Sequence, residues 1–107
     1  MTIVEAGEGR YKVWLEKKVL DHGLAYTLGG GEKSHIGGLV YKEPGNDVQV
    51  IKIQGHHDLE VLLPIAEAAC AKYNRPVAVT GGIHIDNATK DEIAKIIDNC
   101  KELLKCI

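Results

Sequence analysis

The sequence predicts an α+β domain, in which a mainly antiparallel β-sheet carries two packed helices. Two observations lead to this fold class. Residues 11–54 show the two-residue alternation of strands, interrupted by turns rich in glycine. Residues 59–107 show helical spacing of apolar residues twice, on either side of one strand-like run. Consecutive strands with short turns favour an antiparallel meander, and two helices can cover one face of it.

Length and composition limit the class of protein. A chain of 107 residues forms one domain, residues 1–107, because this length supports a single core. A net charge of −2 without a basic stripe argues against a nucleic-acid binder. No apolar run approaches the roughly 20 residues that span a bilayer, and the first residues lack the pattern of a secretory signal. We therefore expect a cytoplasmic protein that binds neither nucleic acid nor membrane.

The three cysteines suggest neither a redox motif nor a zinc knuckle, because no C-x-x-C pair is present. Cys70 and Cys100 fall in expected helices. We expect both to be buried free thiols, which behave as small hydrophobic side chains.

The first half of the chain is expected to form four strands. In the first of them, Val13, Leu15 and Val19 share one face. The last run is apolar enough on both sides to be a central strand. The expected strands are residues 11–20, 24–28, 35–42 and 48–54.

The second half begins with a helix over residues 59–73, where apolar residues recur every three or four positions. Asp58 stands where a side chain normally caps the first turn of a helix. Pro64 lies beyond the first turn, so we expect either a kink or a late helix start there.

The chain is expected to end with a strand over residues 77–85 and a second helix. Thr89-Lys90-Asp91-Glu92 fits the capping box, in which the Thr and Glu side chains bond each other's backbone amides. An apolar stripe then continues at helical spacing to Ile107. The core face of the preceding strand comprises Val77, Val79, Ile83 and Ile85.

A first polar cluster runs from Gly29-Gly30-Gly31 through His35 to Gly37-Gly38. Glycine-rich loops suit phosphate, because backbone N–H groups can approach it closely. This cluster, however, matches neither a P-loop nor a dinucleotide fingerprint. A hairpin loop followed by a strand with glycines at a bend explains it equally well.

A second cluster, Gly55-His56-His57-Asp58, lies between a strand and a helix. Neighbouring side chains of an extended chain point to opposite sides, so His56 and His57 are not expected to hold one metal. Asp58 capping the helix explains the cluster better than a ligand role does.

A third cluster is Thr-Gly-Gly-Ile-His-Ile-Asp-Asn, residues 80–87, at the end of the last strand. Gly82, His84 and Asp86 share one side of an extended chain. His84 and Asp86 could form an acid–base pair or supply two metal ligands. Alternatively, Asn87 turns the chain and Asp86 serves the N-terminus of the final helix. The spacing fits no standard metal motif, and no nucleophile motif stands out.

Taken together, three segments resemble one family: GGGEKSHIGGL (29–39), GHHDLEVLLPIAEA (55–68) and VAVTGGIHIDNATKDEI (77–93). The family is that of LpdD-like prenylated flavin chaperones, known as small accessory subunits of UbiD-type hydroxyarylic acid decarboxylases. It is similar to proteasome assembly chaperones, which implies their fold of a sheet layered with helices.

The resemblance also implies a function: a non-catalytic accessory protein that handles prenylated FMN, or FMN, as a transient ligand. The implied partners are a second copy of the chain and the large subunit of the decarboxylase. No catalytic and no metal-binding residue is expected. The positions that match the family's polar and glycine pattern, and are expected to bind the cofactor, are Gly30, His35, Gly37, Gly55, His56, Asp58, Gly82, His84, Asp86 and Asn87.

Two observations speak against a tight flavin site. His57 stands where arginine or another residue is expected after the Gly-His pair, which speaks against binding of the phosphate if an arginine normally meets it there. Trp14 and four tyrosines are the only side chains that could stack on the ring. Two other functions therefore stay open. One is a small metal-dependent lyase or hydrolase using His35, His56, His84 and Asp86. The other is an assembly chaperone that binds only protein.

Overall fold

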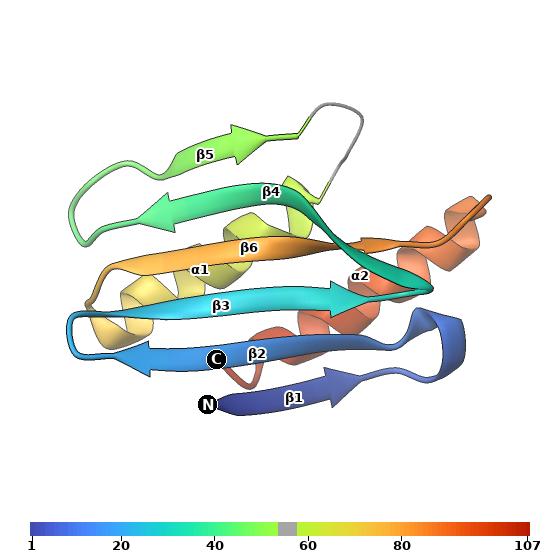
Figure 1. Cartoon of the computed structure of the whole chain (residues 1–107), viewed down its shortest axis with the longest axis horizontal. Coiled ribbons are helices and arrows are strands. Elements are labelled where there is room, and N and C mark those ends of the chain that lie inside the picture. Colours follow the sequence, from blue (N-terminus) through green and yellow to red (C-terminus); the bar gives the residue numbers. More distant parts are fainter. Residues whose placement is uncertain (54–57) are drawn as a thin grey trace.

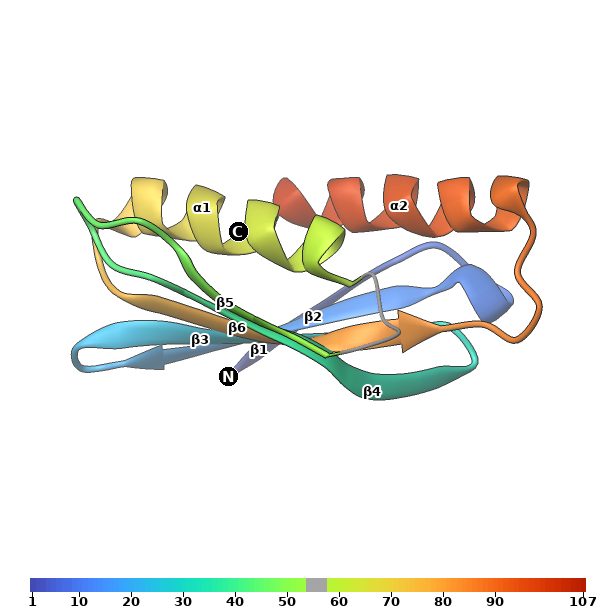
Figure 2. The same ribbon diagram turned by 90° about the horizontal axis from the view of Figure 1, so that it is seen from above.

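A computed structural model describes residues 1–53 and 58–107. Within them, six strands form one sheet in the order β1-β2-β3-β6-β4-β5. Both helices lie on the same face of this sheet, so the molecule has two layers (Figures 1 and 2). The elements are β1 (Thr2–Ala6), a 3-10 turn (Gly9–Tyr11), β2 (Val13–Leu20), β3 (Gly23–Gly30), β4 (Lys33–Lys42), β5 (Gln49–Lys52), α1 (Leu59–Tyr73), β6 (Val77–His84) and α2 (Lys90–Leu104).

The predicted α+β class is confirmed, but the predicted order of strands is wrong. Strand β6 enters the sheet between β3 and β4. It runs parallel to β3 and antiparallel to β4. The meander therefore stops after β3, and the latest strand in sequence takes a central place in the sheet.

Glycines at the end of β3 make this insertion possible. Gly31 forms a parallel bridge to His84, and the backbone N–H of Glu32 donates to the carbonyl of His84 at 2.9 Å. The chain thus crosses over the end of β6, and β3 and β4 lie on opposite sides of it. Gly31 has a φ of +70°, and a Cβ there would lie 2.6 Å from the His84 carbonyl oxygen. Only glycine fits such a crossing without strain.

Three local predictions also need correction. Residues 2–6 form β1, which the sequence analysis did not predict, and the 3-10 turn delays the start of β2 to Val13. The strand expected to be central is the short edge strand β5, in which every residue is exposed. Helix α1 begins at Leu59 and continues through Pro64, so the late start is not observed.

Between the sheet and the helices lies the hydrophobic core. Leu15 and Leu28 face each other across β2 and β3, and both are almost fully buried beneath the helices. Val77 and Val79 of β6 are buried as predicted. The capping box of α2 is confirmed: Glu92 N–H donates to Thr89 Oγ1 at 3.2 Å, and Thr89 N–H donates to Glu92 Oε1 at 3.0 Å. Neither α1 nor α2 is long and apolar enough to cross a membrane.

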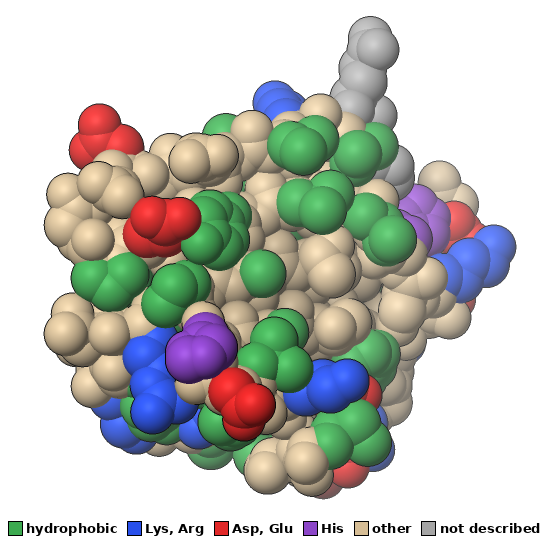
Figure 3. Space-filling model, turned by 60° about the vertical axis from the view of Figure 1, so that its left-hand side comes forward, with side chains coloured by type: hydrophobic (Ala, Val, Ile, Leu, Met, Phe, Trp, Pro, Cys, Tyr) green, Lys and Arg blue, Asp and Glu red, His purple; other side chains and the backbone are tan. Residues whose placement is uncertain are grey.

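The opposite face of the sheet has no covering layer (Figure 2). Because strand side chains alternate, the neighbours of the core residues point to this face. Leu39 and Ile51, which pair across β4 and β5, are 41% and 60% exposed. Around them lies a shallow hollow of about 370 Å³ whose lining also includes Ala25, Tyr41 and Ala78. Seen obliquely in Figure 3, hydrophobic side chains lie among polar ones on this side of the molecule.

Candidate functional site

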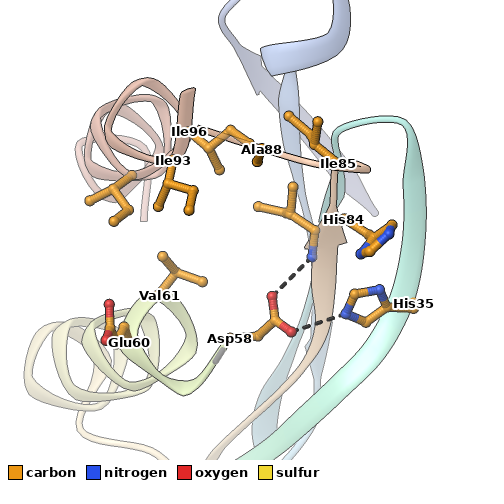
Figure 4. Close-up of a pocket in the computed structure, with 11 residues that line it drawn as sticks. His35, Asp58, Glu60, Val61, His84, Ile85, Ala88, Ile93 and Ile96 are labelled. Atoms are coloured by element: carbon orange, nitrogen blue, oxygen red, sulfur yellow. Dashed lines mark hydrogen bonds and ion pairs between the residues drawn. The ribbon is translucent and has the colours of Figure 1, made fainter. Parts of the chain in front are cut away.

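A pocket of about 320 Å³ lies where the start of α1, the first half of α2 and the end of β6 meet (Figure 4). One corner of it is polar, with His35, Asp58 and His84, whereas Glu60 lies apart from this corner on α1 (Figure 4). The other walls are aliphatic. They comprise Val61, Ile83, Ile85, Ala88, Ile93, Ile96 and Ile97.

The polar corner is organised by the carboxylate of Asp58. Its Oδ1 accepts a hydrogen bond from the backbone N–H of Ile83 at 3.1 Å. Its Oδ2 accepts from His35 Nε2 at 3.0 Å (Figure 4). The side chain of Asp58 makes no capping bond to α1, so the predicted capping role is wrong. Pairing with His35 and β6 satisfies a carboxylate that is only 11% exposed.

Two glycines create the space for this pair. A Cβ on Gly37 would lie 1.9 Å from Asp58 Oδ2, and a Cβ on Gly82 would lie 2.7 Å from the ring of His35. Gly37 falls within the irregularity between Ser34 and Gly38, where β4 shifts its register against β6. Glycines were expected at a bend of this strand. At Gly37 the reason is the contact between His35 and Asp58, which leaves no room for a side chain.

A second histidine–aspartate pair stands beside the first. His84 Nε2 lies 2.8 Å from Asp86 Oδ1, and the rings of His35 and His84 are 5.9 Å apart between centroids. The hydrogen bond from His84 lowers the pKa of Asp86 below its ordinary value, and the charge of Lys33 lowers it further. This pair is much more exposed, at 44% for His84 and 60% for Asp86. It forms the outer edge of the pocket.

An ion-pair network that the sequence analysis missed holds the chain after β6. Glu32 Oε1 accepts from the backbone N–H of Asp86 at 3.0 Å and from Arg10 at 3.2 Å. Arg10 also donates to the carbonyl of Asp86 and lies 3.7 Å from Glu92 of the capping box. The 3-10 turn, the β3–β4 crossing and α2 are thereby tied to the rim of the pocket.

The structure gathers some of the expected cofactor residues and leaves others apart. His35, Asp58 and His84 line the pocket, with Asp86 bonded to His84 at its edge. Asn87 has a φ of +54° in the turn before α2, which agrees with the alternative that it turns the chain there. Gly30, whose missing Cβ admits the backbone of Lys12, packs against β2 and does not line the pocket. Gly55, His56 and His57 lie outside the described residues.

Of the aliphatic wall residues, the sequence analysis placed Ile83 and Ile85 on the core face of the last strand and the isoleucines of α2 in an apolar stripe. Ile93 is 47% exposed in the folded chain, which is more than a core position allows. One signal for these walls was present in the sequence. The first half of the last helix is rich in isoleucine, and it directly follows the polar stretch of residues 80–87. A helical stripe alone does not show whether its first turns are covered.

Metal ligands and thiols are the other candidates for chemistry near the pocket. The described residues contain no group of three or more His, Cys, Asp or Glu side chains placed to hold a metal ion. Burial raises the pKa of the Cys100 thiol to about 12, with a further contribution from Asp58. As predicted, Cys70 and Cys100 are buried free thiols.

Comparisons with known proteins agree with this architecture. The family model for the prenylated flavin chaperone LpdD-like domain matches residues 7–107. A chain from the crystal structure of a chaperone complex for yeast 20S proteasome assembly is similar over 99% of this chain and 98% of its own, with a TM-score of 0.56 and 16% identity. At that identity the likeness concerns the fold alone. The curated proteins contain no match. The predicted resemblance is confirmed by the first two comparisons.

Proposed function

The chain belongs to the family of prenylated flavin chaperone LpdD-like domains, and from this premise we propose that it is a non-catalytic accessory protein carrying prenylated FMN, or FMN, to a UbiD-type decarboxylase. The observation that carries the proposal is the pocket of about 320 Å³, which combines aliphatic walls with one hydrogen-bonding corner. Sites for small organic ligands have this character, with few polar groups set in an apolar lining.

The residues of the polar corner are suited to fix the orientation of a ligand. Asp58 keeps His35 in place, and Asp86 does the same for His84. A carboxylate that accepts from one ring nitrogen sets the tautomer, which leaves the other nitrogen as an acceptor in the neutral ring. An N–H group on a flavin ring is a suitable donor to His84. Gly37 and Gly82 contribute by leaving room for the first pair.

Several features suit transient handling better than permanent binding. The pocket has the volume of the smallest ligand sites, roughly 300 Å³, so part of a flavin-sized molecule lies outside it. Among the described residues that line it there is no tryptophan, tyrosine or phenylalanine, so these residues would give the ring system no aromatic stacking. Modest affinity allows a carrier to give up its ligand.

For the partner surface we propose the uncovered face of the sheet, with a second copy of the chain as its occupant. The molecule measures 39 × 28 Å across this face. The face is therefore large enough to bury the roughly 800 Å² per partner that is typical of stable interfaces. Leu39 and Ile51 supply exposed apolar contacts there. The pocket lies toward the helices, so it stays accessible to the large subunit of a decarboxylase.

The test is native mass spectrometry and fluorescence titration of the purified chain with FMN and prenylated FMN. We expect one flavin per chain, and His84→Ala to weaken binding about tenfold, the loss of about one hydrogen bond. His22→Ala is the matched control, since His22 is an exposed histidine in the β2–β3 turn. Mixing the loaded chain with flavin-free decarboxylase should restore decarboxylation.

A chain that binds no flavin would contradict this function. If it still formed a dimer and captured the large subunit of the decarboxylase, it would act on protein alone. One tightly retained divalent metal per chain, lost in His84→Ala, would instead favour a small metal-dependent enzyme.

A further inference from the structure

We infer that the pocket binds a neutral, branched hydrocarbon group, such as a five-carbon prenyl substituent, and that the phosphate of the same ligand stays outside. That the ligand is a flavin rests on the function proposed above. The orientation follows from the shape and charge of the pocket.

The walls favour a branched aliphatic group over a flat ring. Six of the lining side chains are β-branched, and they come from three parts of the chain. They are Val61 on α1, Ile83 at the end of β6 with Ile85 just after it, and Ile93, Ile96 and Ile97 on α2. Side chains of this kind present methyl groups, which pack well against the methyl groups of a branched ligand. Ile93 is half exposed, so a ligand at the mouth would remove apolar surface from water.

The charges around the pocket oppose a phosphate. Asp58 and Glu60 contribute carboxylates, and the lining residues within 1–53 and 58–107 include neither lysine nor arginine. The start of α1 would otherwise attract an anion, because helix N-termini carry partial positive charge. Here Glu60 occupies the first turn, so its carboxylate offsets part of that positive charge within the chain.

A cation suited to a phosphate lies just beyond the rim. Lys33 stands opposite His84 in the register of β4 and β6. Side chains of such cross-strand pairs lie on the same face and within reach of each other. Lys33 is exposed, and its charge acts on Asp86. Arg10, the other nearby cation, already contacts Glu32 and Glu92. A ligand with its hydrocarbon group in the pocket can therefore extend past His84 toward Lys33.

Two-dimensional ¹H–¹⁵N NMR of the whole chain tests this inference with fragments. Prenol (3-methylbut-2-en-1-ol) should shift the amide signals of Val61, Ile85 and Ile93, whereas inorganic phosphate should leave them unchanged. Ile93→Asp should abolish the response to prenol. Ile36→Asp is the control, because Ile36 is 63% exposed and does not line the pocket.

The outcomes separate this inference from the proposed function. A response to prenol in a chain that binds no FMN or prenylated FMN would support the inference and remove the function. Phosphate shifting the pocket signals would overturn the inference even in a chain that binds flavin. The absence of any response to prenol would overturn it as well.

Discussion

His35 and Asp58, which are 23 residues apart in sequence, meet at 3.0 Å in a gap that exists because two neighbouring positions lack a side chain. The same carboxylate bonds the backbone of Ile83, so it joins the start of α1 to both β4 and β6. The polar corner of the pocket is therefore also a structural junction, and its substitution affects stability as well as binding.

Gly37→Ala should lower the free energy of unfolding by about 1–3 kcal/mol, because the new methyl group displaces the carboxylate of Asp58 from its partners. Urea titration measures the effect. The cause is identified by a double-mutant cycle: Asp58→Ala should relieve part of the cost, so the two changes together should cost less than the sum of their separate effects. Gly45→Ala, whose Cβ meets nothing within 4 Å, should instead be additive with Asp58→Ala.

The pKa of Asp86 should rise toward its ordinary value of about 3.8 when His84 is replaced by alanine, because the largest cause of its lowering is the His84 hydrogen bond. A group whose pKa is lower in the folded chain stabilises it above the unfolded pKa and loses that effect as pH falls through the folded value. The stabilisation by this pair should thus be complete above about pH 4 and should decrease as the pH falls further, through the lowered pKa of Asp86. Carbon-detected NMR of the Asp86 carboxyl follows the titration. An unchanged pKa in His84→Ala, matching His22→Ala, would contradict this assignment.

Thr89→Ala should destabilise the protein by about 1 kcal/mol, because the Glu92 N–H loses its acceptor at the start of α2. Thr89→Ser keeps the hydroxyl and should retain most of the stability. Urea unfolding of the three proteins gives the comparison. Equal stability of the alanine and serine variants would show that the capping bond contributes nothing.

Alkylation at pH 8 should modify Cys106 and leave Cys70 and Cys100 intact, because Cys106 alone of the three is exposed. The raised pKa of Cys100, about 12, also keeps its thiol protonated and unreactive under these conditions. Mass spectrometry after timed quenching locates the label. In urea all three should react, which serves as the control, and labelling of native Cys100 as fast as Cys106 would contradict its burial.

Leu39→Lys should convert the proposed dimer to a monomer, because the new charge would be buried between two sheet faces. Light scattering of the wild-type and variant chains reports the mass. Ile93→Lys places the same charge on an exposed position of α2, on the other side of the sheet, and should leave the dimer intact. A wild-type chain that is monomeric at high concentration would contradict the proposed use of this face.

Local patterns predicted the local elements. The capping box of Thr89 and Glu92 and the pairing of β2 with β3 depend on residues close in sequence, and both were predicted. The place of β6 depends on a crossing at Gly31 that brings distant strands together, and alternation carries no information about the order of strands. Strand β5 illustrates the same limit, since an apolar run does not distinguish an edge strand from a central one.

The candidate site was predicted in its residue types but not in their partners. His84 ends a strand and Asp86 follows two residues later, so their pairing could be anticipated. Asp58 directly precedes α1, the position where aspartate often caps a helix, so the sequence suggested a capping role. The structure instead pairs it with His35 and Ile83, which belong to other strands. Tertiary contacts override a local preference when a buried carboxylate would otherwise lose its hydrogen bonds.

The insertion of β6 between β3 and β4 also has a consequence for how the chain folds during synthesis. The partners of β6 are made first, and the central position of the sheet stays unfilled until residues 77–84 leave the ribosome. Its registration against both neighbours requires contacts over long stretches of sequence, which slow the folding of small domains. Until then β3 and β4 expose unpaired backbone edges, and edges of this kind make an incomplete chain prone to aggregation.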